Sequence, residues 1–588
     1  MGQRHAILFI VTLLSISAVH GKETLMVPMR DGALLATDVY LPSGEGPWPT
    51  ILIRTPYGRG NAGLFDDWGY AVVTQDMRGT GDSEGEKRPF ESDGWGTLRD
   101  GYDTIEWIAK QTWCNGKVGT FGGSALGITQ NLLAGSYPPH LVCQHIQVAA
   151  SDLYSQAAFP GGVFRKSMVE GWLGEHATQE VLEDWKEYPN YGDRWEKFNS
   201  EVRVPGMEYP GFHLGGWYDI FSQGTINAFV ERQHNGGPGS AGNQKLVMGP
   251  WIHAGFFIRK QGELVYPPRS LYILRYFSDA KVFFDYWLKG IDNGLMDQPA
   301  VTYYVMGDVY DLGAPGNEWR EADDWPVPHV NLSLYLTPQG LSTEPGPDSS
   351  HAYSYDPDDP VPTVGGANLV LRAGSMDQRS VEERDDVLVF TTEVLEVPVE
   401  VTGRIYVKLY ASSSCRDTDF MAKLTDVYPD GRSMLVLDGA VQARYRESNE
   451  YEVLMEPGTI YEFTIDLWST SIVFNRGHRI RLAITSSNYP RFEKNLNTGA
   501  PFAERNETFV ADNVIYSGIS HPSEIVLPLA GPDADGDGLY DYIDPDPSVP
   551  VPEEGVVKIV TLLIIGHGLK VRGGKFISPS EGQNSKNS

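Results

Sequence analysis

Residues 22–290 alternate between short apolar runs and helical patterns, and this alternation constrains the fold more than any other feature of the sequence. The clearest helical patterns span residues 99–110 and 125–134. The apolar runs span residues 50–53, 70–74, 118–121, 141–148, 211–214 and 245–248. Strands that alternate with helices form a mostly parallel sheet with helices on both of its faces. The first half of the chain is therefore predicted to be an α/β domain.

Two further changes of pattern divide the chain into parts. Residues 153–203 interrupt the alternation, because they are rich in Trp, Glu, Lys and Tyr and contain no apolar strand. They are predicted to form a helical cap between residues 22–152 and 204–297, the two halves of the core. Residues 298–530 contain many short segments rich in Val, Ile, Tyr and Thr, separated by Gly, Pro, Asp and Ser. This pattern predicts a β-sandwich or jelly roll.

The first residues of the chain follow the pattern of an export signal: a positive charge, an apolar run and then small residues. Arg4 precedes an apolar run over residues 6–19, and the small residues Ala18 and Gly21 lie at suitable cleavage positions. This order predicts a secretory signal peptide over residues 1–21. The alternative is a membrane anchor, but the run is shorter than the ~20 apolar residues that a spanning helix needs. We therefore expect an exported protein, extracellular or periplasmic, with no membrane span after cleavage.

The charge balance excludes one class of partner. The chain carries 47 Lys and Arg against 77 Asp and Glu, a net charge of −30. A surface this acidic repels a phosphate backbone, so nucleic acid is not an expected partner. The chain has three cysteines, none of them at metal-ligand spacing, so a disulfide framework is not expected either.

Ser124 lies in a stretch typical of a nucleophile. Residues 118–127 read VGTFGGSALG, which is a strand, a glycine turn and the start of a helix. Such a turn lifts the serine oxygen out of the sheet. The helix N-terminus also offers backbone N–H groups, including that of Ala125, to a developing oxyanion. The spacing is G-x-S-x-x-G, one residue from the common G-x-S-x-G, and taken alone it also fits a plain turn or a phosphate cradle.

Two titratable residues follow later strands. Asp219 comes after the run at 211–214 and His253 after the run at 245–248. Sites in parallel sheets gather at the carboxyl ends of the strands, and the order Ser, Asp, His is the one that α/β-hydrolases use. Ser124, Asp219 and His253 are therefore the predicted nucleophile, orienting acid and general base. Taken singly, Asp219 also suits a helix cap and His253 a packed loop.

Three large aromatic residues, Trp217, Tyr218 and Trp251, flank the predicted catalytic residues in the sequence. Their position makes them candidates for lining an acyl or leaving-group pocket. Large aromatic side chains are equally common as scaffold, so the pattern leaves both interpretations open.

Several longer stretches together resemble one known family. They span residues 27–32, 54–57, 76–85, 113–119, 417–420, 426–431 and 477–482. Through them, residues 22–529 resemble the cocaine-esterase-like and X-Pro dipeptidyl-peptidase-like serine hydrolases, which include glutaryl-cephalosporin acylases and α-amino-acid ester hydrolases. The resemblance implies an α/β-hydrolase core, a helical cap and a C-terminal jelly roll. Ala125 stands where this family usually has a tyrosine, which removes an aromatic from the pocket wall.

The resemblance also implies a role for Tyr57. In this family a tyrosine of the Pro-Tyr turn donates its hydroxyl to the oxyanion, beside the N–H of the residue after the nucleophile, here Ala125. For Tyr57 the alternative is an aromatic at a surface turn. The expected reaction is acyl transfer to water from a small-molecule ester or amide, or from a short peptide. It runs through an acyl-enzyme and needs no cofactor.

The Asp-rich stretch 531–547 contains a sequence that fits a calcium loop, DADGDGLYDYID. Oxygen ligands at the usual positions of such a loop would come from Asp533, Asp535, Asp537, the backbone of Leu539, Asp541 and the closing Asp544. The sequence therefore predicts a structural calcium, with an acidic linker as the alternative. Residues 548–588 carry no predicted role.

Three functions remain open at this point. The first is an esterase or acylase. The second is an X-Pro dipeptidyl-peptidase, which needs acids to hold the substrate ammonium; Glu170, Glu175 and Asp152 in or near the cap are candidates. The third is a catalytically inactive protein that binds glycans or a surface, and the intact Ser, Asp and His argue against it.

Overall fold

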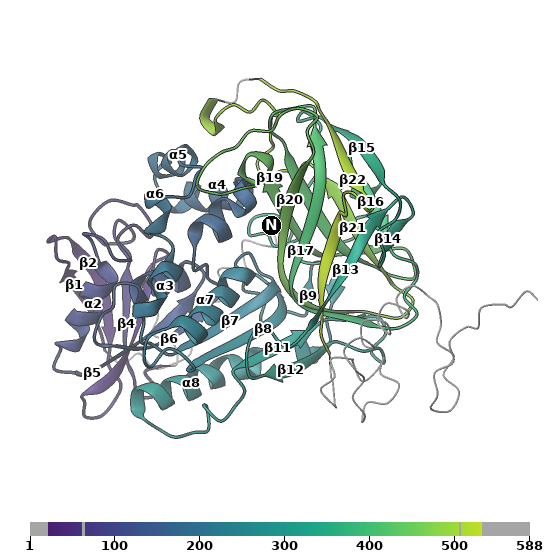
Figure 1. Ribbon diagram of the computed structural model, residues 1–588. Helices are drawn as coiled ribbons and strands as arrows, with labels where there is room; N and C mark the ends of the chain where they lie inside the picture. The colour runs from purple at the N-terminus through teal and green to yellow at the C-terminus, as the bar shows by residue number, and fades with distance from the viewer. Residues whose placement is uncertain (1–20, 61–64, 505–506, 532–588) are drawn as a thin grey trace, which may run out of the picture.

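The computed structural model describes residues 21–60, 65–504 and 507–531 (Figure 1). Its first part is a ten-stranded sheet in the order β1-β2-β4-β3-β5-β6-β7-β8-β11-β12. The strands are β1 Lys22–Pro28, β2 Leu34–Tyr40, β3 Trp48–Thr55, β4 Ala71–Asp76, β5 Cys114–Gly123, β6 Leu141–Gln147, β7 Gly211–Tyr218, β8 Gln244–Ile252, β11 Val301–Val305 and β12 Glu318–Ala322. The strands from β4 to β11 in this order pair in parallel, and antiparallel pairs lie at the two edges. The predicted α/β fold is confirmed.

Helices cover both faces of this sheet. They are α2 Asp100–Ala109, α3 Ala125–Ala134, α7 Ser222–Asn235 and α8 Ile273–Lys289. Successive residues of a strand point to opposite faces, as β3 illustrates. Ile51 belongs to the hydrophobic cluster that contains Phe283 of α8, whereas Leu52 belongs to the cluster that contains Ile105 of α2. Because both faces are buried, β3 appears in the sequence as a continuous apolar run.

The first sheet extends further along the chain than predicted. β11 pairs in parallel with β8, and β12 pairs with β11 at the edge. The hydrolase sheet therefore continues past the boundary expected between residues 297 and 298, because residues 301–322 still pair with it. The sequence of β11 is VTYYV, and β-branched and aromatic residues favour a strand in either kind of domain. Composition alone could not assign this strand to its sheet.

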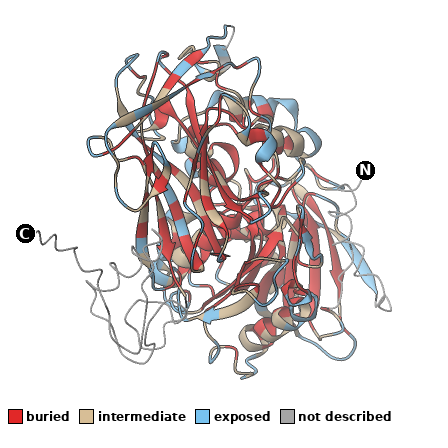
Figure 2. Cartoon of the chain, turned by 90° about the vertical axis from the view of Figure 1, so that its right-hand side faces the viewer, coloured by how far each residue is buried: buried red, intermediate tan, exposed pale blue. Residues whose placement is uncertain are grey.

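The second part is an all-β domain of two sheets, a seven-stranded and a four-stranded one, as the predicted jelly roll requires (Figure 1). Its strands are β13 Val330–Thr337, β14 Gly340–Ser342, β15 Ser349–Tyr355, β16 Leu388–Thr391, β17 Val399–Ser413, β18 Asp419–Val427, β19 Ser433–Gln442, β20 Tyr461–Phe474, β21 Arg479–Thr485, β22 Ala511–Ser517 and β23 Glu524–Leu529. One hydrophobic cluster runs from Leu424 and Ile465 in this domain to Leu246 and Tyr304 in the first sheet. Figure 2 shows buried residues throughout both parts, and because this cluster spans them the two domains share a core.

The predicted cap is helical. It contains the short turns η1 Tyr154–Ala158, η2 Pro160–Gly162 and η3 Ser200–Gly206 and the helices α4 Lys166–His176, α5 Gln179–Glu187 and α6 Asp193–Glu196. Most of its buried apolar residues form one cluster with Ala125 and Ile128 of α3. In Figure 1 the cap helices lie above the core sheet and beside the jelly roll. The cap therefore packs directly on the helix that follows the predicted nucleophile.

Within the described ranges, no helix combines the length and the apolar character needed to cross a bilayer. Cys114, Cys143 and Cys415 are all free and buried. Residues 1–20 of the predicted signal peptide lie outside the described residues.

Candidate active site

Ser124 lies at the sharp turn between β5 and α3. Its backbone has φ 59° and ψ −127°, a conformation that costs a non-glycine residue about 1–3 kcal/mol. Two glycines permit this turn. A Cβ on Gly122 would lie 2.6 Å from that of Leu126, and a Cβ on Gly127 would lie 2.6 Å from that of Ala149. The strand, turn and helix therefore hold the serine hydroxyl clear of the sheet.

His253 bridges Ser124 and Asp219. Its Nε2 lies 2.9 Å from Ser124 Oγ, and its Nδ1 lies 2.6 Å from Asp219 Oδ2. Asp219 directly follows β7 and His253 directly follows β8, and these two strands are parallel neighbours. The structure thus brings together the three side chains that were expected to act together.

The Asp219–His253 pair is almost closed to solvent. The Asp219 side chain has no exposed surface, and that of His253 is 7% exposed. The Phe221 N–H donates to the other carboxylate oxygen of Asp219 at 2.7 Å, and the Phe221 ring packs edge-on against the imidazole. With the carboxylate accepting at Nδ1, the imidazole keeps Nε2 free to accept a proton from the serine.

Tyr57 follows β3 and lies at the same place. The Trp172 indole N–H, from α4, donates to the Tyr57 hydroxyl at 2.9 Å. Although 39% of Tyr57 is exposed, its hydroxyl end is buried; this burial raises the pKa of Tyr57, while hydrogen bonds to Trp172 and Ser124 act in the opposite direction. The phenol stays protonated at neutral pH and is able to donate. Ala125 is the first residue of α3, so its N–H has no acceptor within the helix.

An apolar pocket of ≈ 40 Å³ adjoins Ser124. It is lined by Phe90, Ser124, Ala125, Ile128, Leu153, Ala157, Met168, Val169, Trp172, Leu173, Trp185, Ile220, Phe221 and Leu369. Apart from the serine, these side chains are aliphatic or aromatic, and none carries a charge. A pocket of this kind excludes water and strengthens the electrostatic interactions inside it.

The structure corrects the substrate-binding role expected for three aromatic residues. Trp217 is 1% exposed and donates its indole N–H to the Tyr304 carbonyl at 2.7 Å. Trp251 is fully buried and donates to the Ser270 carbonyl at 2.8 Å, and Tyr218 is 2% exposed. None of the three lines the pocket at Ser124. They lie near the catalytic residues in sequence, but their side chains point into the cores on which the strands pack.

Sequence reasoning missed the residues that form the pocket wall. Met168, Val169, Trp172 and Leu173 lie on one face of α4, and their helical spacing was a signal that could have identified them. Leu369 comes from a loop of the jelly-roll domain far along the chain, and no local pattern connects it with Ser124.

The carboxylates considered for a substrate ammonium lie away from this pocket. Glu170 pairs with Lys166 and Lys186 at 3.2 and 2.7 Å. Asp152 is buried, which raises the pKa of its carboxyl to about 6. Glu175 is exposed, and none of the three acids lines the pocket.

Comparison with known proteins relates this fold and site to one family. Residues 31–183 and 169–255 match the X-Pro dipeptidyl-peptidase (S15) family, and residues 293–526 match the X-Pro dipeptidyl-peptidase C-terminal non-catalytic domain. The chain is 36% identical over 577 residues to cocaine esterase of Rhodococcus sp. (strain MB1 Bresler), an alignment that covers 86% of this chain and 97% of that protein. The chain belongs to this family.

Solved structures of other proteins share the fold of this chain. An α-amino acid ester hydrolase matches with a TM-score of 0.75 at 26% identity, covering 88% of this chain and 98% of its own. An aminopeptidase from a marine sediment Thaumarchaeota archaeon also matches with a TM-score of 0.75 at 24% identity, covering 87% of this chain and 96% of its own. The chain is therefore a serine hydrolase of ester or peptide bonds, as its resemblance to the family implied.

Among residues 21–60, 65–504 and 507–531, no group of three or more His, Cys, Asp or Glu side chains is placed to hold a metal ion. The predicted calcium ligands Asp533, Asp535, Asp537, Leu539, Asp541 and Asp544 lie outside these ranges.

Proposed function

We propose that the chain is an exported esterase or acylase that acts on small neutral esters or amides through an acyl-enzyme. In this mechanism His253 Nε2 accepts the proton of Ser124 as the hydroxyl attacks the substrate carbonyl. Asp219 fixes the imidazole tautomer and offsets its positive charge. The distances of 2.9 and 2.6 Å along this relay support the assignment.

The tetrahedral oxyanion forms where the Tyr57 hydroxyl and the Ala125 N–H meet. Because the Trp172 indole N–H already donates to the Tyr57 oxygen, the phenol hydrogen is directed toward the Ser124 side, where the substrate carbonyl would lie. A donor of this kind is held in place before the reaction begins, which is why it stabilises the transition state efficiently. His253 then returns the proton to the leaving group, and water repeats the sequence on the acyl-enzyme.

The choice of substrate class rests on one observation, the uncharged wall of the pocket at Ser124. A dipeptidyl-peptidase must hold the ammonium of its substrate, and burying an ammonium without a carboxylate is costly. The pocket offers no carboxylate, and its small volume suits an acyl group of roughly two to four carbons. A short, neutral acyl group therefore fits this wall best.

Turnover of p-nitrophenyl esters from acetate to decanoate, compared with Gly-Pro-p-nitroanilide, tests this choice. We expect kcat/KM for the short esters to exceed that for the peptide substrate by about 100-fold or more, because an activated ester reacts more readily than an anilide and the peptide ammonium would in addition lack a partner. Faster cleavage of the peptide substrate would instead assign the chain as a dipeptidyl-peptidase. Failure of a fluorophosphonate to label Ser124 would leave only the inactive, surface-binding alternative.

Two further parts of the proposal rest on the sequence alone. Export is proposed from the N-terminal pattern over residues 1–21, and N-terminal sequencing of the secreted protein tests it. A structural calcium is proposed for residues 533–544, because five carboxylates close together repel one another unless a cation binds. Limited proteolysis with calcium and with chelator tests it. Equally fast cleavage between residues 531 and 547 in both would make the segment an acidic linker.

A further inference from the structure

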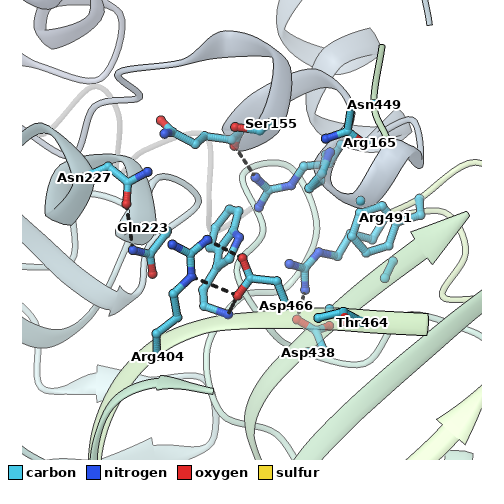
Figure 3. A pocket seen from close by; sticks show the side chains of 17 residues that line it. Ser155, Arg165, Gln223, Asn227, Arg404, Asp438, Asn449, Thr464, Asp466 and Arg491 are labelled. Carbon is cyan, nitrogen blue, oxygen red and sulfur yellow. Dashed lines mark hydrogen bonds and ion pairs between the residues drawn. The ribbon is translucent and has the colours of Figure 1, made fainter. Parts of the chain in front are cut away.

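A second cavity, of ≈ 250 Å³, lies where the cap, α7 and the jelly roll meet (Figure 3). It shares no lining residue with the pocket at Ser124. Its floor is formed by buried side chains such as Arg165, Gln223 and Asp438, whereas Arg404 and Thr464 at its rim are exposed. Solvent-sized molecules can therefore enter from the side of the jelly roll.

Arg165 is the most unusual group in this cavity. It is 1% exposed, and its guanidinium donates to the carbonyls of Gln156, Ile220 and Ala367 at 3.2, 2.8 and 2.7 Å. These bonds use three of its five N–H donors. Within the described part of the chain, no carboxylate forms an ion pair with it. Burial, with a contribution from Arg491, lowers the pKa of Arg165 to about 9, as expected for a buried cation without a counter-charge.

A second buried arginine is only partly satisfied. Arg491 is paired with Asp438 through Nη1, but its Nε is buried and has no hydrogen-bond partner. At the rim, Arg404 forms a two-point pair with Asp466. Figure 3 shows the guanidinium groups of Arg165, Arg404 and Arg491 converging on the same space.

The lining therefore has a surplus of one positive charge, in a chain whose net charge is −30. Buried charges without partners are strongly unfavourable, so an anion in this space would stabilise the site. An arginine with free N–H donors suits a carboxylate, because its planar fork matches the two oxygens.

The neutral part of the lining is rich in groups that bind hydroxyls. It contains the side chains of Ser155, Gln156, Gln223, Asn227, Asn449 and Thr464. The ring of Trp468 lies beside them, with the Arg165 guanidinium 5.6 Å from its centroid. Amide and hydroxyl groups around an aromatic ring suit a ligand with several hydroxyls on a compact carbon skeleton.

We propose that this cavity is an accessory binding site for a small carboxylate that also carries hydroxyl groups, of the size of a sugar acid. The carboxylate lies against Arg165 and Arg491, and the hydroxyls contact the side-chain amides of Asn227 and Asn449 and the hydroxyl of Thr464. Since Arg165 binds the carbonyl of Ile220, directly after Asp219, the site adjoins the loop that carries the proposed catalytic acid without reaching the serine.

Calorimetric titration of the full-length protein with D-glucuronate, D-glucose and acetate tests the proposal. We expect D-glucuronate to bind at least about tenfold more tightly than either control, because only it has both the carboxylate and the hydroxyls. If D-glucose binds as tightly as D-glucuronate, the arginines do not recognise the carboxylate. If acetate binds as tightly as D-glucuronate, the amides do not recognise the hydroxyls. Undetectable binding of D-glucuronate, D-gluconate and L-tartrate would overturn the proposal, as would competitive inhibition of ester hydrolysis by D-glucuronate.

Two matched pairs of variants locate the site. Arg404→Gln at the rim cancels the surplus positive charge of the lining and should weaken D-glucuronate binding at least fivefold. Arg479→Gln, at an arginine of similar exposure in another ion pair, should not weaken it; the exposed fractions are 38% and 37%. Arg165→Met should abolish binding, whereas Arg232→Met, which also removes a buried arginine, should not. Because the buried pair can lose stability, the rim pair decides the outcome. Equal binding by Arg404→Gln and Arg479→Gln would overturn the location.

Discussion

The two cavities on either side of the cap segment 153–165 have opposite chemistry, although this short segment contributes to the lining of both. Leu153 and Ala157 line the pocket at Ser124, whereas Ser155 and Gln156 line the second cavity. One pocket has an uncharged wall, and the other contains three arginines and two aspartates. This segment of the cap is therefore apolar on the face toward Ser124 and polar on the face toward the second cavity.

The difference matters for what each cavity can do. Beside the apolar pocket, the interactions of His253 with Ser124 and Asp219 are shielded from water, because the His253 and Asp219 side chains are 7% and 0% exposed. A transient charge can therefore be stabilised strongly there. In the second cavity the charges are permanent, and they favour binding over chemistry. Substitutions should therefore affect turnover on one side of the cap and ligand affinity on the other.

The largest expected effect is that of Ser124→Ala. It should lower kcat for a short ester by about 10⁴-fold or more, because no nucleophile remains, while the thermal midpoint changes little. Steady-state kinetics and thermal unfolding measure the two. Ser278→Ala, at an exposed serine of α8, is the control and should keep wild-type rates. If Ser124→Ala still hydrolyses the ester, Ser124 is not the nucleophile and the reaction does not take place at the apolar pocket.

Tyr57→Phe should have the next largest effect. Loss of one oxyanion donor typically lowers kcat by about 10²–10³-fold, with little change in KM, because the contact forms mainly in the transition state. Tyr188→Phe, at an exposed tyrosine of the cap, is the matched control. If Tyr57→Phe stays within a few-fold of wild type, the hydroxyl has no part in the reaction.

Leu369→Ala should change selectivity more than rate. Removing this side chain enlarges the apolar pocket, so the ratio of kcat/KM for hexanoate to that for acetate should rise about tenfold, the usual worth of one to two methylene groups. Val370→Ala, at the exposed neighbouring residue outside the pocket, should leave the ratio unchanged. An unchanged ratio in Leu369→Ala would mean that the acyl group lies elsewhere.

The sequence predicted the parts of the molecule that local pattern controls. The strands before Ser124, Asp219 and His253 are short apolar runs, so their ends could be located. The stretches that resemble the family added the expected role of Tyr57. The sequence could not separate β11 from the jelly-roll strands, since a strand's composition does not identify its partner. Nor could it assign Trp217 or Leu369, because the direction of a side chain and contacts between distant segments are set by tertiary packing.

The smallest expected effect concerns a buried histidine at another contact between the two domains. His478 is 1% exposed and binds Asp426 of β18 through Nδ1 at 2.8 Å and Asp308, which follows β11, through Nε2 at 3.4 Å. Burial alone would lower the pKa of His478, but the hydrogen bonds to Asp308 and Asp426 raise it to about 9. The group thus links the hydrolase sheet to the jelly roll as a cation at neutral pH.

A folded pKa above the unfolded value of about 6.5 makes this link stabilising at low pH. The contribution is complete below about pH 6.5 and is lost as the pH rises through about 9, so the free energy of unfolding should fall by about 1–3 kcal/mol across that window. Urea unfolding at about pH 6 and about pH 9.5 measures this change. His478→Gln should remove most of the difference between the two, whereas His140→Gln, with a side chain 44% exposed, should retain it. If His478→Gln keeps the wild-type pH dependence, the charge of this side chain does not stabilise the junction.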